Sequence, residues 1–557
     1  MTVHPQEMEA SMKKVLLLLI ATLATQIGYA QSFTRQDSLR GTLNPMRACY
    51  DVVFYDLHVR IDFDKRTLKG TNQIRFRVVD AFDRMQVDLF ENMKIDEVTA
   101  DDGQKLPFTR EGNAFFVTYP EKLPQGSQQT LVVHYSGKPR EAVNPPWDGG
   151  FSWKKTTDGT PWLGVSCEGL GASVWWPNKD HLSDEPDSMR IVCEVPKPLF
   201  CVANGKLIGQ TETEGNYQAF EWYVSYPINN YNVTLNVTKY EYFADTYTAA
   251  DGDVLALNYY VLPANLDKAR KQFQQVKPML ACYEKYFGKY PFWRDGFALV
   301  ETPYLGMEHQ SAIAYGNGYR NGYMGSDLSG TGVGQSFDYI IIHESGHEYW
   351  GNNISCKDHA EMWIHESFCT YSEALYIECM QGREKADQYL AGYMRSVYND
   401  SPIIGPLGVN ADGSNDMYFK GAVILHTFRN VLDNDPIWFD ILKGLNQDFR
   451  HQTVSTEQII AYINQKAGKD WTPFFDQYLR HRNPPILEYK IKKNKEGCDF
   501  SFRWKTDVSN FEMPIKIKSG SETLLIQPKA DEMQTLHLAH LPEFLPKHYY
   551  IFLEEKH

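Results

Sequence analysis

Apart from its first residues, the sequence has no apolar run that approaches the roughly 20 residues of a membrane-spanning helix. It also shows no internal repeats and no low-complexity segments. Basic residues are too few to balance the acidic ones: 56 Lys and Arg residues stand against 70 Asp and Glu residues, which gives a net charge of −14. This acidic balance argues against nucleic acid or an anionic membrane as a partner.

Cysteine is also limited, with nine in 557 residues, and none has the Cys-x-x-Cys spacing of a second metal site. The odd count leaves at least one thiol without a partner. Cys193 and Cys201 flank two prolines and could face each other across a hairpin. The favoured alternative to a disulfide is that they are free, buried cysteines that pack as small apolar side chains.

The N-terminus has the pattern of a secretory signal peptide. Lys13 and Lys14 precede an apolar run over residues 15–23, and residues 28–30 read Gly-Tyr-Ala. The apolar run is too short to span a bilayer well, and no cysteine follows it to carry a lipid anchor. We therefore expect residues 1–30, with an upstream extension, to direct export to the periplasm or the cell exterior, where disulfides can form.

Length and composition indicate several folded domains. The hydrophobic content of 43% and aromatic content of 14% are globular values, and a chain of this length forms about two to four domains. Strand-like alternation predicts an antiparallel β-sheet domain over residues 31–261. Helical spacing then predicts a mainly helical domain over residues 262–485, and alternation returns in a small β-sandwich over residues 486–557. The predicted fold class is therefore α+β and multidomain.

One short stretch supplies a whole metal site. Residues 343–347 read His-Glu-Ser-Gly-His, and Glu366 follows nineteen residues after the second histidine. Because His343 and His347 lie one helical turn apart, both imidazoles can reach one ion from the same helix face. Glu366, on a following helix, supplies a third ligand. Two histidines and one glutamate leave the fourth tetrahedral position open for water, as in catalytic zinc sites.

The flanking residues favour a buried site over two exposed histidines on a helix surface. The apolar segment 337–342 leads directly into the motif, and ionisable groups are rarely buried without a partner. Zinc held by two imidazoles and a carboxylate lowers the pKa of its water to about 7. Glu344 can accept the proton of that water. We therefore predict hydrolysis of an acyl bond, most simply a peptide bond.

Three motifs in this order resemble the aminopeptidase N family of gluzincin zinc metallopeptidases, which also contains leukotriene hydrolase. Residues 305–309 read Leu-Gly-Met-Glu-His, where the family has Gly-x-Met-Glu-Asn; the metal motif follows; residues 418–421 read Tyr-Phe-Lys-Gly, where the family has Tyr-Glu-Lys-Gly. The resemblance covers about residues 50–480. It implies a saddle-like N-terminal β-sheet domain, a thermolysin-like catalytic domain and one zinc ion per chain.

The resemblance also implies roles for residues outside the metal motif. Tyr418 corresponds to a tyrosine whose hydroxyl stabilises the oxyanion of the tetrahedral intermediate. Glu308 corresponds to the carboxylate that binds the free α-amino group of the substrate, on a segment where Gly306 and Met307 bind the substrate backbone by strand addition. Glu168 resembles a second member of this amine-binding pair. Together they imply an exopeptidase that requires an unblocked N-terminus.

The chain departs from the family pattern in ways that affect specificity. Leu305 and His309 replace the first glycine and the asparagine of their motif, which puts side-chain preference and affinity in doubt but spares Glu308. Phe419 replaces a glutamate beside Tyr418 without evident effect on the tyrosine hydroxyl. The sequence also lacks the large C-terminal helical domain of aminopeptidase N, so we expect a more open cleft that admits longer peptides.

Two questions stay open at this point. Glu373 lies seven residues after Glu366 and hence on the same helix face, where it either accepts a hydrogen bond from a zinc-binding histidine or is a surface acid. The leading function is an exported zinc aminopeptidase that acts on peptides with a free N-terminus; its oligomeric state is open, with a monomer favoured. The alternatives are an epoxide hydrolase, an endopeptidase that uses the same zinc, and a non-catalytic scaffold of the same fold.

Overall fold

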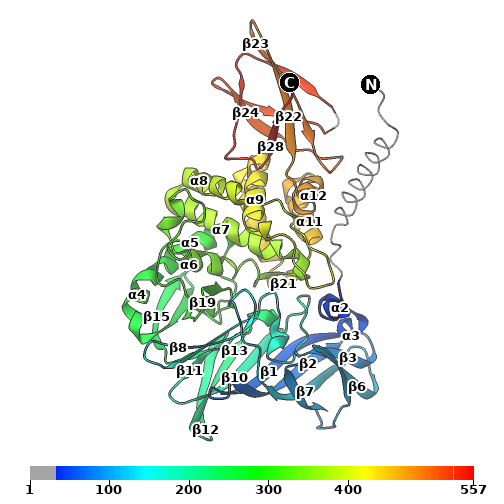
Figure 1. Cartoon of the computed structure of the whole chain (residues 1–557), viewed down its shortest axis with the longest axis vertical. Coiled ribbons are helices and arrows are strands. Elements are labelled where there is room, and N and C mark those ends of the chain that lie inside the picture. The colour runs from blue at the N-terminus through cyan, green and yellow to red at the C-terminus, as the bar shows by residue number, and fades with distance from the viewer. Residues whose placement is uncertain (1–32, 531) are drawn as a thin grey trace, which may run out of the picture.

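The computed structural model describes residues 33–530 and 532–557, and the predicted signal peptide at residues 1–30 lies outside them. The protein has an α+β multidomain fold. A large β domain, a mainly helical domain and a small β domain follow one another along the longest axis (Figure 1). Within the described ranges, no helix is both long and apolar enough to cross a membrane.

The N-terminal domain is built around a seven-stranded sheet in the order β12-β13-β10-β1-β2-β7-β4. We predicted an antiparallel sheet, and this is wrong for one pair, because β1 and β10 run parallel with Phe54 opposite Ser188. Side chains alternate between the two faces in both orientations, so the sequence pattern could not reveal the difference. The strands are β1 (Tyr50–Asp62), β2 (Thr67–Val78), β4 (Met93–Ala100), β7 (Gln128–Gly137), β10 (Ser188–Pro196), β12 (Lys206–Thr213) and β13 (Tyr217–Val224).

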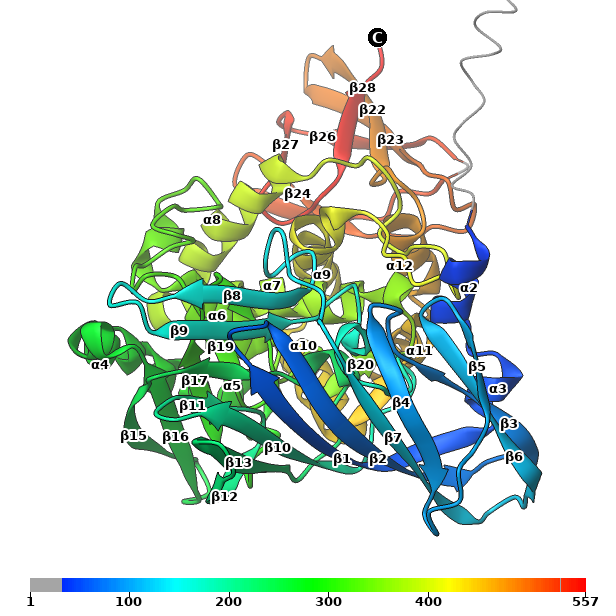
Figure 2. The ribbon, with the colours of Figure 1, turned by 60° about the horizontal axis from the view of Figure 1, so that its bottom comes forward.

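Two smaller sheets, in the orders β11-β14-β9-β8 and β3-β6-β5, complete this domain (Figure 2). Trp175 and Trp176 are fully buried in its core. Strand β9 ends at Ser166, so the segment that carries Glu168 leaves the four-stranded sheet directly. The elements are α2 (Arg35–Gly41), α3 (Pro45–Ala48), β3 (Phe82–Asp88), β5 (Phe108–Glu111), β6 (Ala114–Leu123), β8 (Gly150–Lys155), β9 (Pro161–Ser166), β11 (Phe200–Val202) and β14 (Asn236–Thr238).

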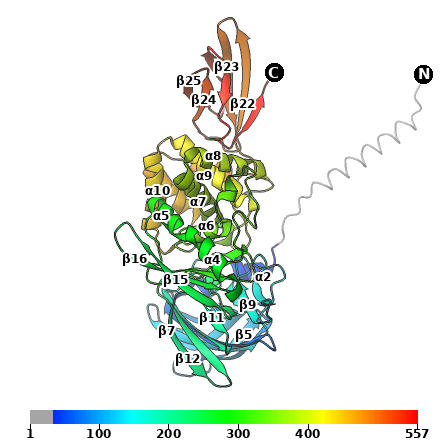
Figure 3. The same ribbon diagram turned by 90° about the vertical axis from the view of Figure 1, so that its left-hand side faces the viewer.

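A five-stranded sheet in the order β15-β16-β17-β19-β18 lies between the N-terminal domain and the helices (Figure 3). The expected boundary at 261/262 follows the change from strand to helix spacing. Sheet pairing instead associates β15 and β16 with the helical domain, since Leu257 of β16 lies opposite Phe297 of β17. Strand β18 is the edge of this sheet. The strands are β15 (Glu241–Thr248), β16 (Val254–Val261), β17 (Phe297–Glu301), β18 (Gly306–Met307) and β19 (Ile313–Tyr315).

The helices of the central domain surround α6, whose eight residues are all buried. Asp338 caps this helix by accepting hydrogen bonds from the backbone N–H groups of Ile340 and Ile341. The helices are α4 (Leu266–Gln272), α5 (Val276–Phe287), α6 (Tyr339–Gly346), α7 (Trp363–Gln381), α8 (Arg383–Tyr393), α9 (Phe419–Leu432), α10 (Asp435–Asp448), α11 (Thr456–Ala467) and α12 (Thr472–Leu479), with a short strand pair β20 (Ile354–Cys356) and β21 (Gln452–Val454).

A disulfide joins Cys282 of α5 to Cys379 of α7. Cys193 and Cys201 are free and buried, as the favoured alternative proposed. The bonded cysteines are 97 residues apart in the chain, so no local spacing in the sequence could indicate that pair.

The C-terminal domain is a β-sandwich of a four-stranded sheet, β26-β23-β22-β28, and a three-stranded sheet, β25-β24-β27. It is joined to the helical domain through Tyr550, whose backbone N–H donates to Thr427 Oγ1 and whose carbonyl accepts from the Tyr478 hydroxyl. The strands are β22 (Ile486–Asn494), β23 (Gly497–Lys505), β24 (Ile515–Ser519), β25 (Glu522–Ile526), β26 (Gln534–Leu538), β27 (Pro542–Phe544) and β28 (Phe552–Glu555).

Candidate metal centre and active site

The two motif histidines and Glu366 meet where α6 packs on α7. Nε2 of His347 lies 3.4 Å from Glu366 Oε2, and Nε2 of His343 lies 3.7 Å from the same oxygen. All three side chains are buried. Ligand atoms about 2.0–2.1 Å from one tetrahedral ion are separated by roughly 3.3 Å. Both separations are close to that value, so Glu366 Oε2 lies where a third ligand beside the two histidines would stand.

Hydrogen bonds at the outer ring nitrogens orient both imidazoles. Nδ1 of His347 lies 2.9 Å from the carbonyl oxygen of Trp350, which can only accept, so Nδ1 carries the proton. Nδ1 of His343 lies 2.7 Å from Glu373 Oε1 in the same arrangement. The Nε2 atoms are then directed towards Glu366 Oε2, a buried atom without a hydrogen-bond partner among the described residues. Two imidazole nitrogens and one otherwise unpartnered carboxylate oxygen form a donor set that fits zinc.

The electrostatics of this centre favour positive charge. Burial lowers the pKa of His343 and His347, but nearby acidic groups, including Cys369 and Glu366, outweigh burial and raise both pKa values well above the usual range. Burial raises the pKa of Glu366, yet the two histidines outweigh it and hold that pKa below its usual value. A site that favours protonated histidines and an ionised carboxylate also favours a cation.

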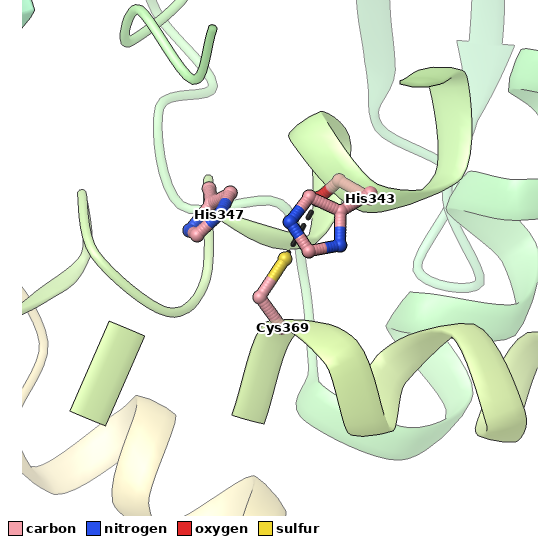
Figure 4. A group of neighbouring side chains, drawn as sticks. All are labelled: His343, His347 and Cys369. Atoms are coloured by element: carbon pink, nitrogen blue, oxygen red, sulfur yellow. Dashed lines mark hydrogen bonds between the residues drawn. The ribbon is translucent and has the colours of Figure 1, made fainter. Parts of the chain in front are cut away.

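Cys369 is a further possible donor at this centre. Its sulfur and ligand atoms of His343 and His347 lie within 4.8 Å of one another. Figure 4 shows the thiol on α7, directed towards the backbone of His343. There it donates to the His343 carbonyl oxygen at 2.8 Å. Glu366 is the better third ligand, because its Oε2 faces both Nε2 atoms and has no other partner.

Glu373 is fully buried behind His343 and is held by two tyrosines. While Oε1 faces the histidine, the other carboxylate oxygen accepts hydrogen bonds from the hydroxyls of Tyr389 and Tyr393, both at 2.7 Å. Of the two alternatives for this residue, the structure therefore places it against the histidine and not at the surface. Carboxylates in this position fix the tautomer and orientation of a metal-binding histidine.

Glu344 lies beside the metal ligands with a perturbed carboxyl group. Burial raises the pKa of Glu344 to about 7, while the two neighbouring histidines act in the opposite direction. A pKa close to the working pH suits a group that must both accept and return a proton. Gly306 lies opposite it, and a Cβ at that position would stand 2.6 Å from Glu344 Oε1 and push the carboxylate aside.

Tyr418 lies on the other side of the centre, at the start of α9. Its hydroxyl donates to Glu366 Oε1 at 3.0 Å. Burial, with a contribution from Glu366, raises the pKa of Tyr418 well above its usual value, so the hydroxyl keeps its proton and acts as a donor. A neutral hydroxyl beside a metal centre can stabilise negative charge that develops on a substrate oxygen.

Glu308 and Glu168 bring two more carboxylates to the same place from different domains. Atoms of Glu308, Glu344 and His347 lie within 4.8 Å of one another. Glu168 comes from the N-terminal domain, and burial together with the nearby Glu308 raises its pKa well above the usual value. A buried carboxylate whose ionisation is disfavoured by a second carboxylate beside it gains from binding a cation such as an ammonium group.

These side chains line one cavity of about 440 Å³. It contains every residue that the sequence motifs singled out for metal binding, chemistry and substrate binding except Glu373, which lies behind His343. Gly306 and Met307 lie in its wall and form the edge strand β18, which pairs with β19 on one side only. The residues brought together are Glu168, Gly306, Met307, Glu308, His343, Glu344, His347, Glu366 and Tyr418.

Comparisons with known proteins agree with this geometry. The family model described as the peptidase family M1 domain matches residues 271–478. The chain is 21% identical over 509 residues to tricorn protease-interacting factor F2 of Thermoplasma acidophilum, covering 85% of this chain and 59% of that protein. It is 22% identical over 470 residues to aminopeptidase N of Escherichia coli, covering 80% of this chain and 51% of that protein.

A solved M1 zinc metallopeptidase from Deinococcus radiodurans has the same fold, with a TM-score of 0.63, 20% identity, and coverage of 78% of this chain and 94% of that one. Residues 271–478 therefore carry a peptidase family M1 domain, and the comparisons support the aminopeptidase N family of M1 gluzincin metallopeptidases. That family implies zinc as the metal. The chain spans only about half the length of the curated M1 relatives that it matches first.

Sequence reasoning from M1 motifs missed two residues of this centre. Tyr231, from a 3-10 turn in the N-terminal domain, donates its hydroxyl to Glu308 Oε1 at 2.9 Å. It stands in an ordinary aromatic context among 34 tyrosines, without a motif to mark it. Cys369 sits three residues after Glu366 on the same helix face, and this spacing was a signal that could have been used.

Proposed function

We propose that the protein is a zinc aminopeptidase that removes residues one at a time from the N-terminus of peptides. One observation carries this proposal: Glu308 and Glu168 share a cavity with the metal ligands and with Glu344. Metal ligands and a base alone describe any metallohydrolase. The pair of carboxylates adds a place for the ammonium group of a substrate beside the bond to be cleaved.

In this proposal the substrate is held by its N-terminal amine and by its backbone. The amine has a pKa of about 7.7–8.0 and is mostly protonated at neutral pH, so it is bound by Glu308 and Glu168. The substrate backbone adds to the free edge of β18, at Gly306 and Met307. A blocked N-terminus would leave both carboxylates without a cation in a buried place, which is costly. The reaction is therefore restricted to free N-termini.

The chemistry divides among three groups. Zinc, when bound by His343, His347 and Glu366, supplies a Lewis acid and lowers the pKa of water. Glu344 takes the proton of the attacking water and returns it to the amine that leaves, for which its pKa of about 7 is well placed. Tyr418 donates its O–H to the carbonyl oxygen as that oxygen becomes negative.

We also propose that the protein is exported and works outside the cytoplasm, as a monomer on peptide substrates. The Cys282–Cys379 disulfide supports an oxidising compartment. A test is to express the full chain and determine the N-terminus of the mature protein and its cellular fraction. A cytoplasmic protein that still carries the apolar run over residues 15–23 would contradict export.

The activity is tested with purified protein loaded with one equivalent of zinc and a set of aminoacyl-arylamides. Hydrolysis is expected in the wild type and a loss of at least about 10³-fold in Glu344→Gln, since the base acts directly on the reacting proton. Glu384→Gln, at an exposed glutamate of α8, is a matched control that should keep wild-type rates. Absence of hydrolysis in wild type and variant alike would refute the proposal.

An N-acetylated peptide separates the exopeptidase from an endopeptidase with the same zinc. The amine-binding carboxylates predict that the acetylated peptide is left intact while the free peptide is shortened from its N-terminus. Internal cleavage of the acetylated peptide would show that Glu308 and Glu168 do not control access.

A further inference from the structure

Two large aromatic side chains stand exposed at the mouth of the active-site cavity. Trp147, in the loop between β7 and β8, is 61% exposed, and Tyr398, in the loop before α9, is 77% exposed. Both line the same cavity as the metal ligands, although they come from different domains. Single exposed aromatic residues are common, but apolar rings grouped at the rim of a cavity mark a place where a ligand is bound.

Each ring is presented by an ordered loop. The carboxylate of Asp148 accepts the backbone N–H groups of Val143 and Asn144, at 2.6 and 2.9 Å, which closes the loop that carries Trp147. In the same manner Asp416 accepts the N–H groups of Tyr398 and Asn399, at 2.9 and 2.7 Å. The backbone that carries each ring is therefore ordered before a ligand arrives, which reduces the entropy lost on binding.

The loops connect each ring to one end of the substrate site. The Trp147 loop contacts the end of β9, where the Ser166 hydroxyl donates to the carbonyl oxygen of Pro146 at 3.5 Å, two residues before Glu168. Asp416, which holds Tyr398, lies two residues before Tyr418. The loop of Trp147 is thus linked to the segment that carries Glu168, and the loop of Tyr398 is linked to the segment that carries Tyr418.

The first side chain of a bound peptide branches from the carbon between its amine and its carbonyl. It must therefore extend from between Glu168 and Tyr418 towards the rim. We propose that Trp147 and Tyr398 bind this first side chain and make the enzyme selective for large apolar residues, above all aromatic ones. This inference rests on the proposed aminopeptidase function and names its substrate class.

The other residues of the cavity wall also favour a large apolar side chain. Its apolar part includes Leu305, Leu328, Ile340 and Phe419, and the Phe419 ring is fixed by stacking on Tyr393 with centroids 4.3 Å apart. Leu305 and Phe419 are two positions at which the chain departs from the family pattern. Both departures enlarge the apolar surface that a substrate side chain meets.

The charged residues of the cavity wall disfavour substrates whose first side chain is acidic or basic. None of the described residues that line this cavity is Lys or Arg, so an acidic first side chain finds no basic side chain to pair with and is repelled by the carboxylates of the wall. The carboxylates of the wall are all engaged elsewhere, as the two amine-binding glutamates, the metal ligand, the base, and Asp416 with its two backbone donors. A guanidinium group would therefore find no free acid to pair with.

The inference is tested with Phe-, Leu-, Ala-, Arg- and Glu-arylamides. In the wild type we expect kcat/KM for Phe to exceed that for Ala by at least about tenfold, with Glu the slowest. Trp147→Ala and Tyr398→Ala should each lower kcat/KM for Phe about five- to tenfold through KM, with less than a twofold change for Ala. Tyr242→Ala, an exposed aromatic residue of β15 outside this cavity, is the control and should leave the ratio unchanged.

A binding measurement keeps this inference separate from the proposed activity. In zinc-loaded Glu344→Gln, calorimetry should show that phenylalaninamide binds at least about tenfold more tightly than alaninamide, and that Trp147→Ala removes the difference. This result would support the aromatic site even if no arylamide were hydrolysed. Equal binding of the two amides, or a preference for Arg or Glu substrates, would overturn the inference while leaving the aminopeptidase function intact.

Discussion

The Tyr231 hydroxyl of the N-terminal domain donates a 2.9 Å hydrogen bond to Glu308 Oε1 of the helical domain. The backbone of Glu308 is held as well, since Asn352 Nδ2 donates to its carbonyl oxygen at 2.7 Å. Glu308 is therefore fixed at both its side chain and its main chain by groups from two domains. Such preorganisation lowers the entropy that substrate binding would otherwise cost.

Removing the charge of Glu308 should weaken substrate binding through the amine. Glu308→Gln keeps the shape and the Tyr231 contact but loses the attraction to the ammonium group. We expect KM for aminoacyl-arylamides to rise at least about tenfold, since a charge-assisted contact contributes about 1.5–3 kcal/mol. Steady-state kinetics of the two proteins measure it. An unchanged KM would show that Glu308 does not bind the amine.

Tyr231→Phe tests whether Tyr231 is a positioning residue. Loss of one hydrogen bond to Glu308 should raise KM by about fivefold and leave kcat within about twofold, because the reacting groups are untouched. A merely structural role would lower the melting temperature without this split between KM and kcat. Equal effects on kcat and KM would contradict the assignment.

The contact between Glu373 and His343 should control metal affinity. Glu373→Gln leaves a neutral acceptor at the Nδ1 proton, and the imidazole becomes a weaker ligand. We expect zinc affinity to fall about 10- to 100-fold, measured by competition with a coloured chelator. Tyr389→Phe is the matched control, because Tyr393 still donates to the same carboxylate oxygen. Equal zinc affinity of Glu373→Gln and wild type would count against the role.

The raised pKa of Glu344 predicts the direction in which kcat/KM changes with pH. The base must be ionised, so kcat/KM should fall as pH decreases through about 7. Bound zinc lowers this pKa, so the acid limb should lie at or below that pH in the metal-loaded enzyme. A pH profile of kcat/KM measures it. A limb well above pH 7 would assign the titration to another group.

The raised pKa of Glu344 makes folding stability decrease with rising pH, whereas it makes kcat/KM increase. The folded pKa of Glu344 lies above its ordinary value, so the folded metal-free protein binds the proton more tightly than the unfolded chain. Stability is therefore lost as pH rises from about 4.5 through 7. Metal-free Glu344→Gln, which cannot ionise, should melt at a higher temperature than metal-free wild type at pH 8 and show little difference at pH 5.

Tyr418→Phe removes one hydroxyl that faces the metal centre. We expect kcat to fall about 10²- to 10³-fold, as for other single oxyanion donors, with KM within about threefold. Because the hydroxyl also contacts Glu366, zinc content must be measured in parallel. A variant that has lost zinc in proportion to its activity would show a ligand-holding role instead.

The disulfide should contribute to the stability of the helical domain. It closes a loop with a sequence separation of 97 residues between α5 and α7, for which chain entropy predicts a contribution of up to about 4–5 kcal/mol. Cys282→Ala with Cys379→Ala should lower the melting temperature by several degrees, and a reductant should do the same to the wild type. Cys498→Ala, at a free buried cysteine, controls for the loss of a packed thiol.

The site residues that could be predicted from the sequence are those that lie in short motifs. The spacing of His343, His347 and Glu366 follows from helix geometry, and the helix–loop–helix between them brings the ligands together as expected. Resemblance to known motifs identified Glu308, Glu168 and Tyr418. The structure brings all of them to one cavity, although nearly 200 residues separate Glu168 from Glu366.

What could not be predicted depends on contacts between distant segments. Tyr231 has no motif, and its contact with Glu308 exists only because two domains pack together. Strand β1 pairs in parallel with β10, and β15 and β16 belong to the five-stranded sheet with β17. Neither fact changes the alternation of side chains along the strands, so the sequence pattern does not reveal them. The exposure of Trp147 and Tyr398 likewise becomes visible only when both loops meet at one cavity.

Because Glu168 belongs to one domain and the metal ligands to another, a peptide bound as proposed would also be a cross-link between them. Any ligand that binds only the assembled pair stabilises that assembly by mass action, by an amount that grows with the logarithm of its concentration. An enzyme working through a supply of peptides would thus be protected against separation of its domains and against proteolysis there. When little peptide is left to bind, this stabilisation would be lost. The rate at which proteases degrade the protein would then depend on the concentration of its own substrate.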